Sequence, residues 1–218
     1  MHAAMDRIPT DAEILALHER HAPSPEALDL VYTHCEIVCR IAEQLLPATT
    51  GNSATSINAG LVRAGCLLHD VGVYRLYDDA GHLDNRGYIR HGVLGHELLR
   101  AAGLPEEICR FASHHTGVGL TRDDVIRQRL PLPPADYLAD TREEALVMYA
   151  DKFHSKTTPP TFWTPASYAA SIRRYGADKA AAFEDLRAQF GDPDLTLLAR
   201  AYGHCVSLHT RRLTHQAT

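Results

Sequence analysis

The spacing of apolar residues along this chain constrains its fold more than any other feature. Almost every periodic segment repeats apolar residues at intervals of three and four, and runs of alternating Val, Ile and Thr are absent. A three-and-four interval places apolar side chains on one face of a helix, whereas alternation is typical of half-buried strands. We therefore expect an all-α protein in which any strands are trivial.

Capping residues and helix breakers divide this pattern into segments. Ser24 is expected to cap a helix that begins at Pro25 and runs to about Leu46, and a small-polar loop is expected over 47–56. Gly72 is expected to end a later helix in the left-handed conformation. The remaining expected helices cover 11–20, 58–71, 90–103, 105–116, a segment started by a Thr141–Glu144 capping box, 165–175, 178–190 and 195–208, with a loop over 73–88 and a linker over 157–165.

Composition excludes several classes of protein. The 218 residues carry 22 Lys+Arg and 27 Asp+Glu, a net charge of −5, and 45% of them are hydrophobic, which is enough for a full core. No basic run exceeds two residues, which argues against a nucleic-acid partner. No segment reaches the roughly 18 apolar residues of a membrane span, and the N-terminus is acidic where a signal peptide is apolar. We expect a cytoplasmic protein without a membrane partner.

The five cysteines are odd in number, form no CxxC pair and lie in apolar periodic stretches. This pattern favours reduced, buried thiols over disulfides or zinc sites. The residues concerned are Cys35, Cys39, Cys66, Cys109 and Cys205.

Histidine is unusually frequent, with 14 residues, and several histidines fall on apolar helix faces. His34 shares its face with Val31 and Val38, and the pair His69-Asp70 ends an apolar helix. A buried carboxylate beside a buried imidazole is costly to desolvate unless a cation compensates it. Because helix neighbours lie roughly 100° apart, the pair reaches one ion only at the helix edge, or Asp70 bridges two ions.

The same test of helical phase selects three further residues. His91 lies on a stripe with Leu98, His115 shares its face with Phe111, and Asp151 is stacked on an apolar turn. Imidazole nitrogens with carboxylate oxygens and no thiolate suit Fe, Mn, Co, Ni or Zn. Six ligands exceed what one catalytic ion uses, so we expect one or two divalent ions and favour two that share Asp70. The full set is His34, His69, Asp70, His91, His115 and Asp151.

The order His34, His69-Asp70, His91, His115, Asp151 resembles the HD superfamily of metal-dependent phosphohydrolases, in the branch with two additional histidines. The supporting strings are LLHDVG at 67–72, HG at 91–92, HTG at 115–117 and YADK at 149–152, so the likeness covers about 24–156. The resemblance implies a helical bundle of about five core helices with additional C-terminal helices. It implies an HD domain over 1–156, with its core at 24–156, and a C-terminal extension over 157–218 that packs on it.

The resemblance also assigns roles. His34, His69, Asp70 and Asp151 would hold the first ion, and Asp70, His91 and His115 the second. Water activated by these ions would attack phosphorus in line, with Asp70 central to catalysis. Lys152 is the first candidate for binding substrate phosphate, and Arg75 and Arg90 are further candidates. Candidate proton donors are His96, His114 and His154, and Tyr74, Tyr77 and Tyr88 either stack on a base or pack over the core edge.

The leading hypothesis is a phosphohydrolase acting on a nucleotide or another small phosphorylated metabolite. Two alternatives stay open, an HD-fold di-iron oxygenase and a non-catalytic sensor that binds a nucleotide. The insertion at 73–88 departs from the shortest family members and leaves substrate entry open. The apolar face of the 178–190 helix, with Ala180, Phe183, Leu186 and Phe190, packs either on the core or on a second subunit, so a homodimer also stays open.

Overall fold

A computed structural model describes residues 7–46 and 56–207, so the loop expected at 47–56 lies almost entirely outside the described residues. The described chain is mostly helical, as the apolar spacing predicts, and has one small sheet. Its α-helices are α1 (Asp11–His21), α2 (Pro25–Leu45), α3 (Ala59–Leu68), α4 (His91–Ala101), α5 (Glu106–Ser113), α6 (Arg122–Arg127), α7 (Arg142–Asp151), α8 (Pro165–Ile172), α9 (Ala177–Phe190) and α10 (Thr196–Tyr202). Its strands are β1 (His154–Ser155), β2 (Thr161–Trp163) and β3 (Cys205–Ser207). None of the described helices is long and apolar enough to cross a membrane.

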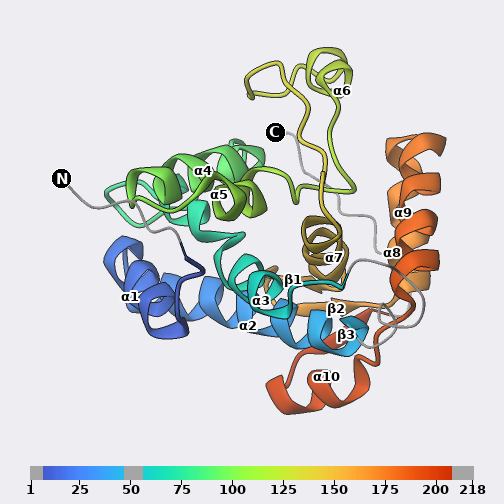
Figure 1. The fold of residues 1–218 in the computed structure, drawn as a ribbon, viewed down its shortest axis with the longest axis horizontal. Coiled ribbons are helices and arrows are strands. Elements are labelled where there is room, and N and C mark those ends of the chain that lie inside the picture. The colour runs from blue at the N-terminus through green and yellow to red at the C-terminus, as the bar shows by residue number, and fades with distance from the viewer. Residues whose placement is uncertain (1–6, 47–55, 208–218) are drawn as a thin grey trace.

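Helices α2, α3 and α7 contact one another and form the centre of the molecule (Figure 1). Helices α4 and α5 pack together on one side of α7, and α8 and α9 lie on its other side. Helix α6 stands on an arm that projects from this body. The central helices therefore have neighbours on both sides, and polar side chains on their inner faces are removed from water.

Helix α2 begins at the predicted residue and buries the predicted face. The Ser24 hydroxyl accepts a hydrogen bond from the Ala27 N–H at 3.2 Å, and Pro25 occupies the first helical position. Val31, His34 and Val38 are all buried. Helical phase therefore placed an imidazole inside the core, among apolar neighbours.

The segment after α3 departs from the prediction. Helix α3 ends at Leu68, residues 69–70 form a turn, and 71–76 is a 3-10 helix. Gly72 does not adopt a positive φ, so its predicted left-handed role is wrong. A Cβ on Gly72 would lie 2.0 Å from the His91 carbonyl oxygen and 2.3 Å from the Gly95 nitrogen. Glycine is required here because two backbones touch, and this contact fixes the turn that carries His69 and Asp70 against α4.

Replacement of Gly72 by Ala is expected to destabilise the protein by about 3 kcal/mol, because the added methyl group meets backbone atoms that cannot rotate away. Urea unfolding measures the loss. The control is Gly60→Ala in the exposed first turn of α3, where the nearest atom to a new Cβ is Asn58 Oδ1 at 3.4 Å. The control is expected to be neutral or mildly stabilising, since Ala is the better helix former. Equal stability of Gly72→Ala and wild type would contradict the backbone contact.

Capping of α7 follows the prediction in part. The Thr141 hydroxyl accepts from the Glu144 N–H at 3.1 Å, but the Glu144 carboxylate accepts from the Asp140 N–H and from Arg110. Only half of the predicted capping box is therefore seen. A complete box between Thr121 and Asp124 begins α6, a helix that the sequence analysis did not predict.

The C-terminal part of the described chain contains strands where a linker and a helix end were predicted. Strand β2 pairs antiparallel with β1 and parallel with β3, so the predicted boundary between residues 156 and 157 falls between β1 and β2. Helix α10 ends at Tyr202 because Gly203 adopts the left-handed conformation, so the helix predicted over 195–208 is too long. Strands of two or three residues are too short for an apolar period to reveal. Cys205 is exposed in β3, so the prediction of a buried thiol is wrong for this residue.

The apolar face of α9 packs within the chain. Phe183 and Phe190 are fully buried, and their rings lie 5.6 and 5.9 Å from the ring of Tyr149 on α7. Phe153, which follows α7, joins the same aromatic cluster. This packing anchors the C-terminal segment beside the helix that carries Asp151.

Candidate metal centre

The structure gathers all six predicted ligand residues from five parts of the chain. Each lies at or near the end of an element that the core holds in place, except His34, which lies within α2. His69 and Asp70 form the turn after α3, His91 is the first residue of α4, His115 follows α5, and Asp151 ends α7. All are buried apart from Asp151, which is half-buried. Because His69 and Asp70 lie beyond the helix, the 100° separation of helix neighbours does not restrict them.

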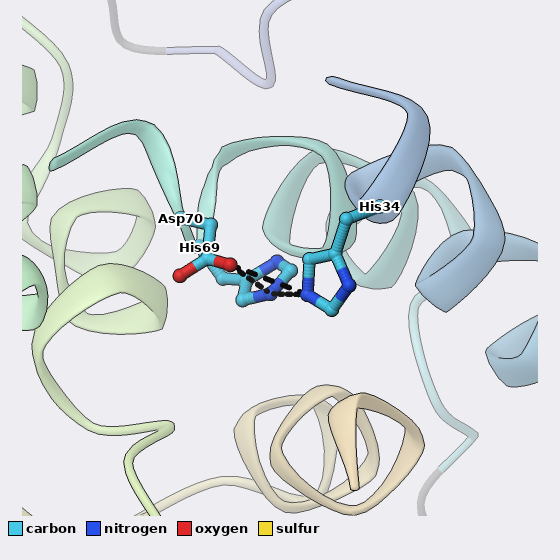
Figure 2. A group of neighbouring side chains, drawn as sticks. All are labelled: His34, His69 and Asp70. Atoms are coloured by element: carbon cyan, nitrogen blue, oxygen red, sulfur yellow. Dashed lines mark hydrogen bonds and ion pairs between the residues drawn. The ribbon is translucent and has the colours of Figure 1, made fainter. Parts of the chain in front are cut away.

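The first group of ligand atoms surrounds His34 Nε2. This atom lies 3.3 Å from His69 Nε2, 3.2 Å from Asp70 Oδ2 and 3.0 Å from Asp151 Oδ1. Figure 2 shows His34 on one side and His69 with Asp70 on the other, their polar atoms pointing toward one another. Four donor atoms from three parts of the chain thus meet at one point.

The second group lies on the other side of the Asp70 carboxylate. His91 Nε2 and His115 Nε2 are 2.9 Å apart, and they lie 3.4 and 3.6 Å from Asp70 Oδ1. Asp70 therefore directs Oδ2 to the first group and Oδ1 to the second. Donor atoms of His69, His115 and Asp151 also lie within 4.8 Å of one another, so the two groups adjoin.

Backbone carbonyls determine which ring nitrogen of three histidines is free. Nδ1 of His69 lies 2.7 Å from the Cys66 oxygen, Nδ1 of His91 lies 2.6 Å from the Tyr88 oxygen, and Nδ1 of His115 lies 3.1 Å from the Phe111 oxygen. A carbonyl only accepts hydrogen bonds, so each Nδ1 carries a proton, and the Nε2 of a neutral ring is then a lone pair. When both rings are neutral, the Nε2 lone pairs of His91 and His115 consequently face each other, an arrangement that a cation beside them stabilises.

The charges of the cluster also favour a cation. Burial alone would raise the pKa of Asp70, but the Lys156 ammonium and His69 hold it well below its usual range. Burial acts to lower the pKa of His69, yet the Asp70 carboxylate raises it well above its usual value. Burial lowers the pKa of His91 to about 4, which keeps this ring neutral and able to bind a metal. The carboxylates thus stay ionised and attract positive charge to the buried centre.

The donor geometry fits transition-metal ions. Ligands bound at about 2.1 Å lie about 3.0 to 3.4 Å from one another around a tetrahedral or octahedral ion. The separations between donor atoms within the two groups run from 2.9 to 3.6 Å, and all donors are imidazole nitrogens or carboxylate oxygens. The buried His and Asp groups are therefore consistent with a metal site.

Two lysines contact the ligand carboxylates. Lys152 Nζ donates to Asp151 Oδ2 at 2.7 Å and to the His115 carbonyl oxygen at 3.0 Å, so it braces two ligand residues. Lys156, which sequence reasoning missed, forms an ion pair with Asp70 Oδ2 and lies 6.0 Å from the centre of the Tyr88 ring. Its side chain is 15% exposed. Lys156 lies beyond the end of α7, where no helical phase could have selected it.

A cavity of about 490 Å³ opens beside the cluster. Asp151, His154 and Lys156 form its inner wall, where the ligand cluster borders it. Leu83 and Asn85 of the predicted 73–88 insertion also line it. Of the tyrosines proposed to stack on a base, Tyr88 lines the cavity, whereas Tyr74 is buried and hydrogen-bonded to His18 and Tyr77 is half-buried.

Of the other predicted substrate residues, Lys152 lines this cavity, whereas two histidines and two arginines do not. His96 Nδ1 is 2.9 Å from Ser113 Oγ, and His114 Nδ1 is 2.6 Å from the same oxygen. Arg75 and Arg90 are exposed and do not line the cavity. Their positions give no support to the roles in proton donation and phosphate binding that the sequence suggested.

His154 has a different position, because it contacts a ligand residue. Its Nδ1 lies 2.8 Å from His34 Nδ1, and its Nε2 lies 3.0 Å from His204 Nδ1. The sequence analysis did not select His204. The contact depends on strand pairing between segments about 50 residues apart, which leaves no local signal.

Comparison with known families agrees with this site. The family model described as HD domain matches residues 31–156, more than half of the chain. The chain belongs to the HD-domain family. All six residues of the cluster lie inside the matched HD domain, whereas His204 lies outside it.

Curated relatives share the HD region in part. An uncharacterised protein of Methanocaldococcus jannaschii is 39% identical over 121 residues, which cover 56% of this chain and 64% of that protein. A tRNA (cytidine(56)-2'-O)-methyltransferase of Picrophilus torridus is 32% identical over 132 residues, or 61% of this chain and 33% of the enzyme. The chain therefore matches between about one third and just under two thirds of these relatives' own length.

Two solved structures are more distantly similar to this chain. The L. monocytogenes phosphodiesterase PgpH HD domain is 19% identical with a TM-score of 0.48, over 87% of this chain and 97% of that one. The same domain in complex with cyclic-di-AMP is 19% identical with a TM-score of 0.49, over 87% and 96%.

Proposed function

We propose that this HD-domain protein is a metal-dependent phosphohydrolase that cleaves a phosphoester or phosphoanhydride bond of a small phosphorylated compound, with a nucleotide as the leading substrate class. The observation that carries the proposal is the convergence of four imidazole Nε2 atoms and two carboxylates on one buried point, with Asp70 between two groups. Membership of the family supports the reaction type.

His34, His69, Asp70 and Asp151 would hold one ion, and Asp70, His91 and His115 would hold the other. When bound, such divalent ions supply Lewis acidity, which activates water and offsets charge on phosphoryl oxygens. The chain contributes rigid ligand positions, because three of the imidazoles are held by backbone carbonyls. Lys152 keeps the Asp151 carboxylate ionised and oriented through a bond of 2.7 Å.

Lys156 is the group best suited to bind the phosphoryl oxygens. Its ammonium lies at the inner wall of the cavity, against the Asp70 carboxylate, and is largely shielded from water. Burial acts to lower the pKa of Lys156, but Asp70 and the neighbouring Tyr88 and Asp151 raise it, so the side chain stays charged. A fixed cation in a shielded pocket interacts strongly with a phosphoryl group.

The rest of the cavity supports an aromatic substrate. Its volume lies in the range of small-molecule sites, about 300 to 1,000 Å³. Tyr88, Trp163 and Tyr168 line it, and Arg174 adds a further cation. Aromatic side chains stack on planar rings, and arginine pairs with phosphate, so a nucleobase with its phosphate groups matches this lining.

A phosphate-release screen tests the proposal. Metal-stripped protein is supplied with Mn, Fe, Co or Ni and offered nucleoside mono-, di- and triphosphates, dinucleoside polyphosphates and cyclic dinucleotides. We expect turnover of at least one class and its loss on stripping. Undiminished turnover by metal-free protein would overturn metal dependence. Turnover that requires oxygen would instead indicate an oxygenase, and tight nucleotide binding without product would indicate a sensor.

A further inference from the structure

A row of three imidazoles runs from the ligand residue His34 toward the protein surface. His34 Nδ1 lies 2.8 Å from His154 Nδ1, and His154 Nε2 lies 3.0 Å from His204 Nδ1. Ring centroids are 5.1 Å apart at each step, with interplanar angles of 28° and 17°. His34 and His154 are buried, whereas His204 is half-buried.

The small sheet brings the outer member of this row into place. Strand β2 lies between β1 and β3 and pairs Phe162 with His154 on one side and with Val206 on the other. The Phe162 ring also lies 4.9 Å from the His154 ring and 5.9 Å from the His204 ring. The position of His204 therefore depends on the segment after residue 156.

His34 differs from the other histidines of the cluster in what its Nδ1 contacts. The carbonyl partners of His69, His91 and His115 only accept, which fixes the proton of each ring on Nδ1. An imidazole partner either donates or accepts, so contact with His154 alone leaves the proton of His34 free to lie on either nitrogen. In the competing tautomer the proton of His34 lies on Nε2. Asp151 Oδ1 lies 3.0 Å from this nitrogen and would accept a hydrogen bond from it.

Only one direction of hydrogen bonding leaves His34 Nε2 free for an ion. His34 Nδ1–H then donates to His154 Nδ1, and His154 Nε2–H donates to His204 Nδ1. Without an acceptor at residue 204, the buried Nε2–H of His154 would lose its partner, which is costly. Moving that proton to Nδ1 of His154 would place the His34 proton on Nε2, where it blocks metal binding.

We propose that His154 and His204 are positioning residues of the metal centre, which hold the proton of His34 on Nδ1 and keep its Nε2 free for an ion. The inference rests on the proposed function, because it presupposes that His34 binds a metal. The inference also makes His204, which lies outside the matched HD domain, part of the metal centre.

Variants at residue 204 separate this role from simple packing. His204→Asp retains an acceptor atom at the same number of bonds from Cα as Nδ1, whereas His204→Phe retains the ring and loses the acceptor. A packing role predicts that Phe is tolerated better, and the positioning role predicts that Asp is. His21→Phe is the control, since His21 is also half-buried but ends α1 away from the cluster.

Zinc affinity and stoichiometry are measured by competition with a chromophoric chelator, after thermal unfolding has shown that each variant folds. We expect His204→Phe to weaken one of two zinc equivalents by about 10- to 100-fold. His204→Asp and His21→Phe are expected to bind like wild type. Nitrogen-15 NMR of the metal-free proteins reads the tautomer directly, with the His34 proton on Nδ1 in wild type and shifted toward Nε2 in His204→Phe.

His154→Asn provides a second route to the same answer, because its Oδ1 accepts from His34 but its short side chain does not reach residue 204. Adding His204→Phe to this variant is expected to cause no further loss of zinc affinity. Wild-type affinity in His204→Phe, or weaker binding by His204→Asp than by His204→Phe, would overturn the inference alone. A wild-type protein that binds no ion under any condition would overturn the proposed function as well.

Discussion

Replacement of Asp70 by Asn is expected to lower kcat by about 10³-fold or more, since losing even an outer partner of a metal ligand costs about 10- to 100-fold. The Asp70 carboxylate directs one oxygen to each group of ligand atoms, and an amide offers one neutral oxygen in its place. The variant should also lose metal, which elemental analysis of the purified protein measures.

A matched control separates this effect from general damage to the core. Glu144 is another buried carboxylate, paired with Arg110 away from the cluster. Glu144→Gln is expected to lower stability while the bound metal per chain stays at the wild-type value. Full metal content and turnover in Asp70→Asn would show that this carboxylate does not bridge two ions.

Replacement of Lys156 by Gln is expected to lower kcat/KM by about 10²-fold, the loss seen when one donor to a developing charge is removed. The reason is the position of its ammonium at the inner wall of the cavity, beside the Asp70 carboxylate. Steady-state kinetics with the substrate identified by the phosphate-release screen measure the loss. Metal content should change much less than in Asp70→Asn, because Lys156 is not a ligand.

Lys179 offers a closely matched control, because it too is a largely shielded lysine paired with a buried aspartate. Its Nζ lies 2.6 Å from Asp124 Oδ2 and donates to the Gly119 carbonyl oxygen. Lys179→Gln is expected to reduce stability and leave kcat/KM unchanged. If Lys156→Gln turned over substrate as well as Lys179→Gln does, the phosphate-binding role would be refuted.

Helical phase selected four of the six residues of the cluster, and the pair His69-Asp70 was selected by its position at the end of an apolar helix. His34 and His91 lie on the apolar faces of their helices. Because such a face packs against the core, both side chains are buried. His96 and His114 fall on other faces and are found away from the cluster, hydrogen-bonded to Ser113. The rule works because the geometry of a helix is local, so the sequence of one segment is enough to orient its side chains.

The residues that the sequence did not reveal depend on contacts between distant segments. His204 contacts His154 because β2 pairs with both β1 and β3. Lys156 lies in the connection between β1 and β2, where no periodic spacing of apolar residues indicates the direction of a side chain. Gly72 illustrates a different limit. A glycine after a helix is compatible with a left-handed cap or with close backbone approach, and only the position of α4 decides between them.

The contact between Gly72 and α4 also has a consequence for how such proteins diversify. The loop over 77–87 leaves from one side of this contact and returns to the other, so both of its ends are anchored independently of its own sequence. Doubling the length of such a loop costs only about 0.6 kcal/mol in closure entropy. Because Leu83 and Asn85 of this loop line the cavity, insertion or recombination there can change the cavity lining while the His and Asp cluster is inherited intact.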